Sequence, residues 1–378
     1  MITGQKDNAM AAARAPETAV VVGTGLIGTS IALALRERGS RVWLSDKDQA
    51  AARLAADLGA GQLLPAGALP DGPADVAILA VPPGAVARSL DEAQRHGLAR
   101  CYTDVASVKE LPLREARESG CDLGSFVPGH PMSGRERSGP AAARADLFAG
   151  RSWVICPAPE TKPDCVAVVA DLALACGAQP VTLTAAEHDR WVALVSHMPH
   201  LVASVVAAQC ADAPAGALAL AGPGLRDVTR IAASDARLWT EILAANAEPV
   251  RDVLLAVARQ LADSAAALAG IAAGKPDATA SLTTALEAGQ AGVERIPGKR
   301  GGPAPHYSVV QVVIGDQPGE LARLFVAAGA AGINIEDVRI EHSPGLPVGV
   351  AELSVRPEAA ERLSTALAAR GWPVASPA

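Results

Sequence analysis

Short apolar runs alternate with longer stretches of helical period through the first half of the chain. Between residues 19 and 183 the apolar runs are bounded by Gly, Pro or Asp, and the helical stretches 27–38 and 164–176 are each followed by a glycine. Glycine suits the left-handed position that ends a helix. This alternation predicts a doubly wound α/β domain with strands at 19–22, 41–44, 76–80, 101–103, 126–128, 153–156 and 180–183.

The pattern changes at Thr184, which forms a T-x-x-E capping box with Glu187. Nothing that resembles a strand follows for about a hundred residues, so an all-α domain is predicted. Apolar and histidine positions recur there every three or four residues, at 194, 197, 198, 201, 202 and 205. Short helices of one chain cannot cover all such faces, and we expect this domain to form a homodimer.

Residues 295–305 are rich in Pro and Gly, as in an exposed tether. Beyond them the order is strand, helix, strand, strand, helix and a short terminal strand, which predicts an α+β domain of the βαββαβ type. The predicted domains are therefore 17–183, 184–294 and 306–378, with 295–305 as the linker.

Composition narrows the classes of partner. Half of the residues are hydrophobic and 19% are charged, which excludes a disordered chain. A formal net charge of −7 and a pI near 5.6 argue against binding to nucleic acid or to an anionic membrane surface. A bound anion must therefore be held by a local group of cations.

The six cysteines form no C-x-x-C pair and no metal spacing, so they are interpreted as reduced core residues of a cytoplasmic protein. Residues 1–16 lack the apolar core of a signal peptide, and the least polar stretch, 191–210, is interrupted by serine and histidine. No membrane span is expected.

The sharpest motif is a G-x-G-x-x-G turn formed by Gly23, Gly25 and Gly28, between a predicted strand and a predicted helix. These glycines permit a tight turn, close approach of a pyrophosphate and close helix packing, which predicts a Rossmann-like dinucleotide site. Asp46 ends the second strand, where a carboxylate accepts hydrogen bonds from an adenosine ribose. It would repel a 2′-phosphate, so NAD is favoured over NADP as cofactor.

Two further segments follow predicted strands at the edge where such sheets bind ligands. Ser107 lies in the first; it either orients a neighbour or caps the helix that follows. His130 lies in the second, directly after a strand and before Pro131. That exposed position among glycines favours proton transfer over a structural role.

The helical domain contributes His188, His197 and His200, but no spacing such as H-E-x-x-H, so no metal site is predicted. A buried, satisfied imidazole is the ordinary fate of a histidine on such a helix. Arg230 follows a glycine-rich loop and is either a surface partner of Asp227 or Asp235, or a clamp for a ligand carboxylate.

Taken together, five motifs between residues 19 and 243 resemble those of the prephenate/arogenate dehydrogenases of tyrosine biosynthesis. They are G-T-G-L-I-G-T-S, T-D-V-A-S-V-K, G-H-P-M-S-G, S-H-M-P-H and R-D-V-T-R-I-A, in that order. The tail motifs D-Q-P-G-E-L and G-I-N-I resemble those of an ACT regulatory domain, a module that often binds amino acids.

The resemblance implies NAD-dependent oxidative decarboxylation of prephenate to 4-hydroxyphenylpyruvate. It implies that His130 accepts the proton of the substrate's hydroxyl, that Ser107 orients either His130 or that hydroxyl, and that Arg230 binds a carboxylate. By the same resemblance the substrate is also contacted by His200, Ser133, Glu136 and Asp227, and the cofactor by Gly23, Gly25, Leu26, Ile27, Gly28 and Asp46.

For the tail, the resemblance implies that Asp316, Gly319 and Asn334 bind an amino-acid effector, tyrosine or phenylalanine. The alternative is a dimerising module that binds nothing. For the whole chain the alternatives are an arogenate dehydrogenase that produces tyrosine, a 4-amino-4-deoxyprephenate dehydrogenase, and a sensor of nucleotides or amino acids without turnover.

Overall fold

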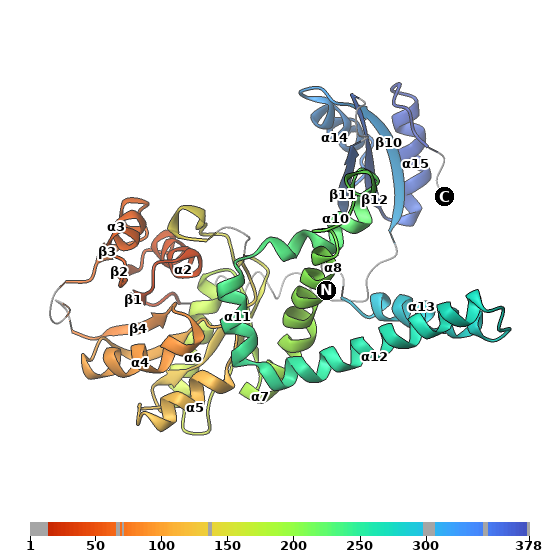
Figure 1. Ribbon diagram of the computed structural model, residues 1–378. Helices are drawn as coiled ribbons and strands as arrows, with labels where there is room; N and C mark the ends of the chain where they lie inside the picture. The colour runs from red at the N-terminus through yellow and green to blue at the C-terminus, as the bar shows by residue number, and fades with distance from the viewer. Residues whose placement is uncertain are drawn as a thin grey trace. The chain divides into compact units, whose positions relative to one another are not determined.

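The computed structural model describes residues 14–65, 69, 72–134, 138–297, 307–342 and 347–375 (Figure 1). The chain divides into two compact units, Met1–Ala258 and Arg259–Ala378. The domain boundaries drawn from the sequence at residues 183 and 294 stay predictions.

A six-stranded parallel sheet forms the centre of the first unit, in the order β3-β2-β1-β4-β5-β6. The strand order reverses between β1 and β4, and ligands of such sheets bind outside the carboxyl ends of the strands at this point. The sheet confirms the predicted Rossmann-like fold. Its strands are β1 (Thr18–Val22), β2 (Arg41–Ser45), β3 (Gln62–Leu63), β4 (Ala74–Leu79), β5 (Ala99–Asp104) and β6 (Phe126–Val127).

Helices cover the sheet on both faces because successive side chains of each strand point to opposite sides. Val21 packs into a core with α2 (Leu26–Glu37) and α6 (Pro163–Ala175), whereas Val20 packs into a second core with α4 (Val86–Arg95) and α5 (Glu110–Glu118). Burying one leucine or valine of this kind stabilises the fold by about 1.5–3 kcal/mol. The remaining helical elements of this part are α3 (Gln49–Asp57), η1 (Pro83–Ala85) and η2 (Pro140–Ala142).

A second, three-stranded sheet contains the last two strands expected for the doubly wound sheet. It consists of β7 (Gly129–Pro131), β8 (Ser152–Ile155) and β9 (Gln179–Thr182), and β7 runs antiparallel to β8. The parallel ladder ends at Pro128, which has no N–H to continue it. Instead the carbonyl of Pro128 accepts the N–H of Cys156 at 2.8 Å, and the chain turns into β7.

From Thr184 to Glu294 the described chain is helical, as predicted, and the capping box of Thr184 and Glu187 is present. A π-helical turn, η3 (Ala193–His197), interrupts the first long helix between α7 (Ala185–Val192) and α8 (Met198–Ala208). The elements that follow are α9 (Ala215–Leu218), α10 (Pro223–Thr229), η4 (Arg230–Ala233), α11 (Ala236–Ala245), α12 (Ala247–Ala272) and α13 (Ala278–Glu294).

The C-terminal region is an antiparallel α+β unit with strand order β10-β12-β11. Its elements are β10 (Ser308–Gly315), α14 (Glu320–Ala330), β11 (Asp337–His342), β12 (Val348–Val355) and α15 (Pro357–Ala368). Alternate residues of β12 are buried against both helices. The predicted terminal strand is present as one bridge from Val374 to Val312.

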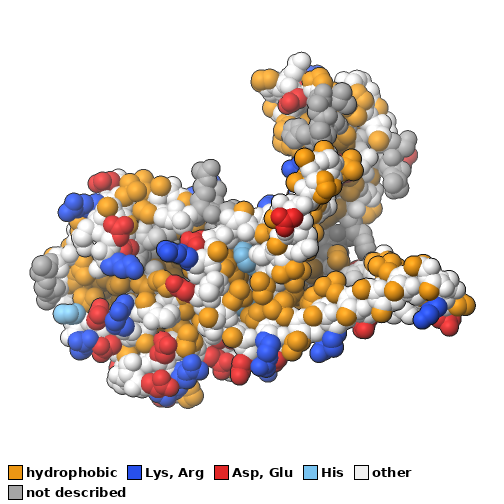
Figure 2. Space-filling view, viewed as in Figure 1, with side chains coloured by type: hydrophobic (Ala, Val, Ile, Leu, Met, Phe, Trp, Pro, Cys, Tyr) orange, Lys and Arg blue, Asp and Glu red, His pale blue; other side chains and the backbone are white. Residues whose placement is uncertain are grey.

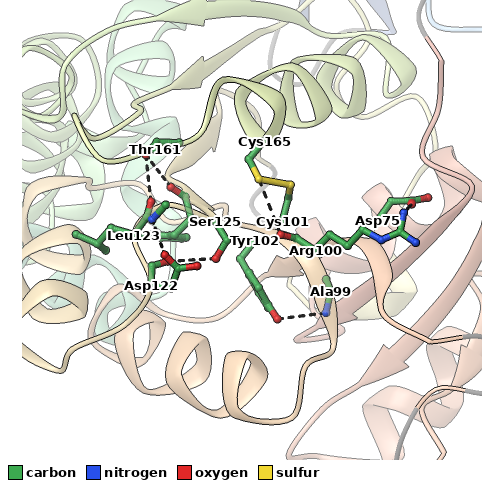
Figure 3. Close-up of a disulfide and its surroundings, with 12 residues drawn as sticks. Asp75, Ala99, Arg100, Cys101, Tyr102, Asp122, Leu123, Ser125, Thr161 and Cys165 are labelled. Carbon is green, nitrogen blue, oxygen red and sulfur yellow. Dashed lines mark hydrogen bonds and ion pairs between the residues drawn. A yellow bond between two sulfur atoms is a disulfide. The ribbon is translucent and has the colours of Figure 1, made fainter.

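A disulfide joins Cys101 of β5 to Cys165 of α6 (Figure 3). The expectation that all six cysteines are reduced is therefore wrong for this pair. The two residues are 64 positions apart, and only the packing of α6 on the sheet brings them together. The bond ties α6 to the strand whose last residue is Asp104. The other four, Cys121, Cys156, Cys176 and Cys210, are free.

Thiol titration checks this disulfide directly. In denaturant without reductant the chain should react as four thiols, and after reduction as six. Closing a loop of this length constrains the unfolded chain, so the double variant C101A/C165A should lose up to about 4 kcal/mol of stability. Six thiols before reduction would contradict the assignment.

Candidate active site

The glycine turn after β1 has the geometry that its motif predicts. Gly23 has φ +99°, and a Cβ there would lie 2.2 Å from the carbonyl oxygen of Ala80. A Cβ on Gly28 would lie 2.0 Å from the carbonyl oxygen of Gly23, whereas the position above Gly25 is open. The turn and the close crossing therefore require glycine, and the open position leaves room for a ligand.

Helix α2 begins directly behind this open position, with Gly25 as its N-cap and no side chain capping it. The first N–H groups of the helix, including those of Leu26 and Ile27, are therefore left for another acceptor. Their partial positive charge suits a pyrophosphate. These residues fit the phosphates of a dinucleotide.

Asp46 follows β2 and lies half-buried against the same turn. Its carboxylate accepts the backbone N–H of Thr24 at 2.6 Å, the hydroxyl of Thr24 at 2.9 Å and the N–H of Asp48 at 2.9 Å. Asp46 thus joins the end of β2 to the glycine turn. This is the place where a carboxylate that binds the adenosine ribose is expected. Its contact with ribose stays a prediction.

A fully buried ion pair builds the neighbouring edge of the sheet. The ammonium of Lys109 donates to the carboxylate of Asp104, the last residue of β5, and to the carbonyl oxygen of Gly129 at 2.6 Å. The other oxygen of Asp104 accepts the N–H of Gly129 at 3.1 Å. Both backbone groups of Gly129 are therefore held, which fixes the residue before His130.

Close contact between β7 and the end of β5 further restricts the position of Gly129. A Cβ on Gly129 would lie 2.9 Å from the carbonyl oxygen of Asp104 and from the hydroxyl of Thr103, and 3.1 Å from the indole nitrogen of Trp153. No other residue fits without a shift. The strand β7 therefore passes tightly across the end of β5 and carries His130 to the edge where β5 ends.

His130 is linked to the helical segment by a chain of hydrogen bonds. Its Nδ1 lies 2.8 Å from Nε2 of His188, and Nδ1 of His188 lies 2.7 Å from Oδ1 of Asp189. The same carboxylate accepts the N–H of Lys109 at 2.8 Å and that of Glu110 at 2.9 Å. Asp189 thereby binds the first turn of α5 from helix α7.

Burial sets the charge of these imidazoles. It lowers the pKa of His130 well below 6.5, and the neighbouring His188, Lys109 and His197 lower it further. Burial also lowers the pKa of His188, against the opposing effect of Asp189. Both rings are therefore neutral at pH 7, which is the form that can accept a proton.

A second group of polar side chains adjoins Asp189. The side-chain amide of Asn246 donates to the carbonyl oxygen of Asp189 at 2.8 Å and lies 3.0 Å from Nδ1 of His197. Burial lowers the pKa of His197 to about 4. His200 stacks on Trp239 with ring centroids 3.5 Å apart and planes 5° apart. The π-turn η3 leads into this group, because His197 is its last residue.

The remaining predicted site residues occupy varied surroundings. Ser107 is half-buried and makes no hydrogen bond to another described residue, whereas the hydroxyl of Ser133 donates to the carbonyl oxygen of Leu147 at 2.8 Å. Arg230 and Asp227 are exposed, and η4, which Arg230 begins, packs against α8. Glu136 lies outside the described residues.

The three predicted effector residues lie in the C-terminal unit. The N–H of Asp316 donates to the carbonyl oxygen of Pro347 at 3.0 Å. Gly319 has φ +94° and is the N-cap of α14, and the side chain of Asn334 donates to Glu336 at 2.9 Å. All three are exposed, and their contact with an effector stays a prediction.

Sequence reasoning assigned no role to Asp104, Lys109 and Asp189, which hold His130 and His188 in place, or to Asn246 and Trp239, which contact His197 and His200. Asp104 and Lys109 belong to the quoted motif T-D-V-A-S-V-K, where an acid and a base five residues apart could have suggested a pair. Asp189 follows His188 directly, but its partners Lys109 and Glu110 lie about 80 residues away. Among the described residues, no group of three or more His, Cys, Asp or Glu is arranged to hold a metal ion.

Two family models match the chain in succession. One is described as the nucleotide-binding domain of prephenate dehydrogenase and matches residues 31–182. The other is described as the dimerization domain of prephenate dehydrogenase and matches residues 184–277. Together they include α2 from Ile31 onward, the imidazole chain and α12.

Individual relatives agree with these matches. A protein of Streptomyces niveus named probable prephenate dehydrogenase NovF is 41% identical over 366 residues, which is 95% of this chain and 99% of the relative. The solved prephenate dehydrogenase of Aquifex aeolicus, in complex with hydroxyphenyl propionate and NAD+, has a TM-score of 0.64 and 22% identity over 74% of this chain and 99% of its own. The solved arogenate dehydrogenase of Synechocystis has a TM-score of 0.61 and 25% identity over the same shares.

The buried pair can be tested by its effect on stability. Replacing Lys109 with Met leaves Asp104 buried without its cation, which should cost about 3–5 kcal/mol of unfolding free energy. Arg117→Met is the matched control, because it breaks an exposed pair with Glu160 and should cost less than about 1 kcal/mol. Urea denaturation followed by circular dichroism measures both, and equal losses would contradict the role given to Lys109.

Proposed function

The chain belongs to the prephenate dehydrogenase family, and on that premise we propose that it catalyses the NAD-dependent oxidative decarboxylation of prephenate to 4-hydroxyphenylpyruvate. This makes it an oxidoreductase of tyrosine biosynthesis. The observation that carries the proposal is the neutral imidazole of His130, whose Nε2 has no hydrogen-bond partner among the described residues. It lies at the edge where β5 ends, and the glycine turn lies at the end of the parallel strand β1.

The glycine turn and the start of α2 would hold NAD, which would accept the hydride that leaves the carbinol carbon of the substrate. The ring carboxylate then departs as CO2 and the ring becomes aromatic, which drives the reaction. The protein's part is to position the ring and to take the hydroxyl proton. Nε2 of His130 accepts that proton as the hydride leaves, and returns it to the ring oxygen once CO2 has departed, so that the product carries a hydroxyl. Ser107, whose hydroxyl has no hydrogen-bond partner among the described residues, orients the same group.

The substrate carries two carboxylates, and an acidic chain needs local cationic or N–H donors to bind them. We assign this task to Arg230, at the start of η4, and to His200, on the helix that η4 packs against. Stacking on Trp239 holds the imidazole of His200 in one orientation. Ser133, Asp227 and Glu136 complete the proposed substrate contacts, with Asp227 and Glu136 controlling entry.

Arogenate is the second candidate substrate, because a solved relative at 25% identity is an arogenate dehydrogenase. Prephenate is favoured because the relative with 41% identity over 95% of the chain is named for prephenate. Asp46 would repel the 2′-phosphate of NADP, which favours NAD. Measuring kcat/KM for the four pairs of substrate and cofactor separates these cases, and the prephenate and NAD pair should be the highest.

We also propose that the chain is a homodimer through its helical domain. An apolar groove of about 550 Å3 lies where α8, α11 and the first half of α12 meet, and Figure 2 shows apolar side chains gathered along these helices. Leu255 is 51% exposed and Val205 56% exposed.

Two helical stretches, Ala185–Ala208 and Ala247–Ala272, are long and apolar enough to cross a membrane. Length and composition alone are weak evidence for a membrane span. Both stretches lie within the match to a dimerization domain.

The C-terminal unit is proposed to be an ACT-like regulatory domain that binds tyrosine or phenylalanine near Asp316, Gly319 and Asn334. Its βαββα order and the left-handed glycine that begins α14 support this. Calorimetric titration of either amino acid into the full chain tests it, alongside inhibition of turnover. The cytoplasmic location expected from the sequence stays a prediction.

The role of His130 predicts the outcome of one substitution. In His130→Asn the amide keeps a donor near the position of Nδ1, facing His188, but removes Nε2. Turnover should fall at least about a hundredfold, the size of a lost general base, while the Michaelis constant for NAD is unchanged. His96→Asn, at an exposed helix end, is the control and should leave turnover unchanged. A near-normal rate for His130→Asn would exclude His130 as the base.

The charge state of His130 predicts the pH profile. Protonation of His130 removes the lone pair that accepts the substrate proton. Because the pKa of His130 lies well below 6.5, activity should be lost only when the pH falls below 6.5. A plot of kcat/KM against pH should stay level from pH 8 to pH 6.5 and fall at lower pH, with an apparent pKa that belongs to the His130 and His188 pair. A fall in kcat/KM that begins above pH 7 would contradict the neutral imidazole of His130.

A further inference from the structure

The carboxylate of Asp189 has one fixed hydrogen-bonding role. Its two oxygens face the backbone N–H groups of Lys109 and Glu110, which can only donate. Asp189 therefore accepts from every neighbour in this group. Nδ1 of His188, 2.7 Å from Oδ1, must then carry a hydrogen and donate it.

This assignment propagates along the chain. A neutral imidazole carries one hydrogen, so Nε2 of His188 has a lone pair once Nδ1 is the donor. Nδ1 of His130 lies 2.8 Å from this Nε2. Because Nε2 of His188 accepts, Nδ1 of His130 must carry a hydrogen and donate it. Nε2 of His130 is then left with its own lone pair, which no described residue uses. Free histidine favours the opposite tautomer, with the hydrogen on Nε2.

We propose that His188 and Asp189 are positioning residues that hold His130 in the tautomer with a free lone pair on Nε2. The proposal rests on the proposed function of His130 as proton acceptor. The arrangement follows the logic by which a carboxylate orients a catalytic imidazole in hydrolytic triads, here extended by one more ring.

The same chain affects the charge that develops during the reaction. When His130 takes the substrate proton it becomes an imidazolium, and His188 connects it through two hydrogen bonds to the carboxylate of Asp189. Among the described residues, the other charged or titratable groups near it are Lys109 with its partner Asp104, at the end of β5, and His197, at the end of η3. Lys109 and His197 disfavour a positive charge on His130. The hydrogen-bonded link through His188 to the carboxylate of Asp189 stabilises that charge.

Two substitutions of His188 test the pair. A glutamine places its amide group near the position of Nε2, so its carbonyl oxygen can accept from His130. An asparagine places its amide near the position of Nδ1, so it can donate to Asp189 but cannot reach His130. His188→Gln should keep kcat within about fivefold of the original, and His188→Asn should lower it about 10- to 100-fold, as for lost supporting contacts elsewhere. The Michaelis constant for NAD should be unchanged in both.

Equal loss of kcat in the two variants would overturn the proposal, because it would show that only the packing of His188 matters. Values within twofold of the original in both would also overturn it. Thermal denaturation of each variant shows whether a loss of kcat reflects a loss of folding. A purely structural role would lower the melting temperature together with kcat, whereas the proposal places the difference between asparagine and glutamine in kcat.

A second readout does not depend on turnover. Nitrogen NMR of the full chain labelled at its seven histidines reports which ring nitrogen of His130 carries hydrogen, with His130→Asn identifying the signal. Hydrogen on Nδ1 is expected, and hydrogen on Nε2 would overturn the proposal. An original chain that does not oxidise prephenate or arogenate would instead refute the proposed function, while the NMR result would still decide the tautomer.

Discussion

The carboxylate of Asp189 joins the helical segment to the start of α5 in the nucleotide-binding part of the chain. It accepts the N–H groups of Lys109 and Glu110, at the start of α5, and the imidazole hydrogen of His188. Because backbone N–H groups cannot reverse their role, this one carboxylate determines the direction of each hydrogen bond that leads to His130. The orientation of α7, the start of α5 and the protonation of the candidate base are therefore set together.

A buried polar network of this kind stabilises one arrangement only when all its members have partners. Here the partners come from β5, β7, the start of α5, α7 and Asn246 at the end of α11, so the network requires several elements to be in place at once. Lys109 illustrates the constraint, since its backbone N–H binds Asp189 while its ammonium binds Asp104 and Gly129. One residue thus links the carboxylate that orients the imidazoles to the pair that positions β7.

Features that depend on residues close together in the chain could be predicted from the sequence. The glycine turn, the parallel strands, the capping box at Thr184 and the βαββα order all follow from local spacing, and the structure has them. The sequence was insufficient where distant segments meet. The disulfide between Cys101 and Cys165, the separate sheet of β7, β8 and β9, and the partners of Asp189 are set by tertiary packing, which periodicity does not encode. His188 illustrates the limit, because its helix suggested an ordinary buried histidine and its bond to His130 spans 58 residues.

The central claim is that His130 presents a lone pair at Nε2 because its hydrogen is held on Nδ1 by His188 and Asp189. Neutron diffraction from deuterium-exchanged crystals locates these hydrogens directly. The account predicts deuterium on Nδ1 of both His130 and His188 and none on Nε2 of either ring. Deuterium on Nε2 of His130 would contradict it.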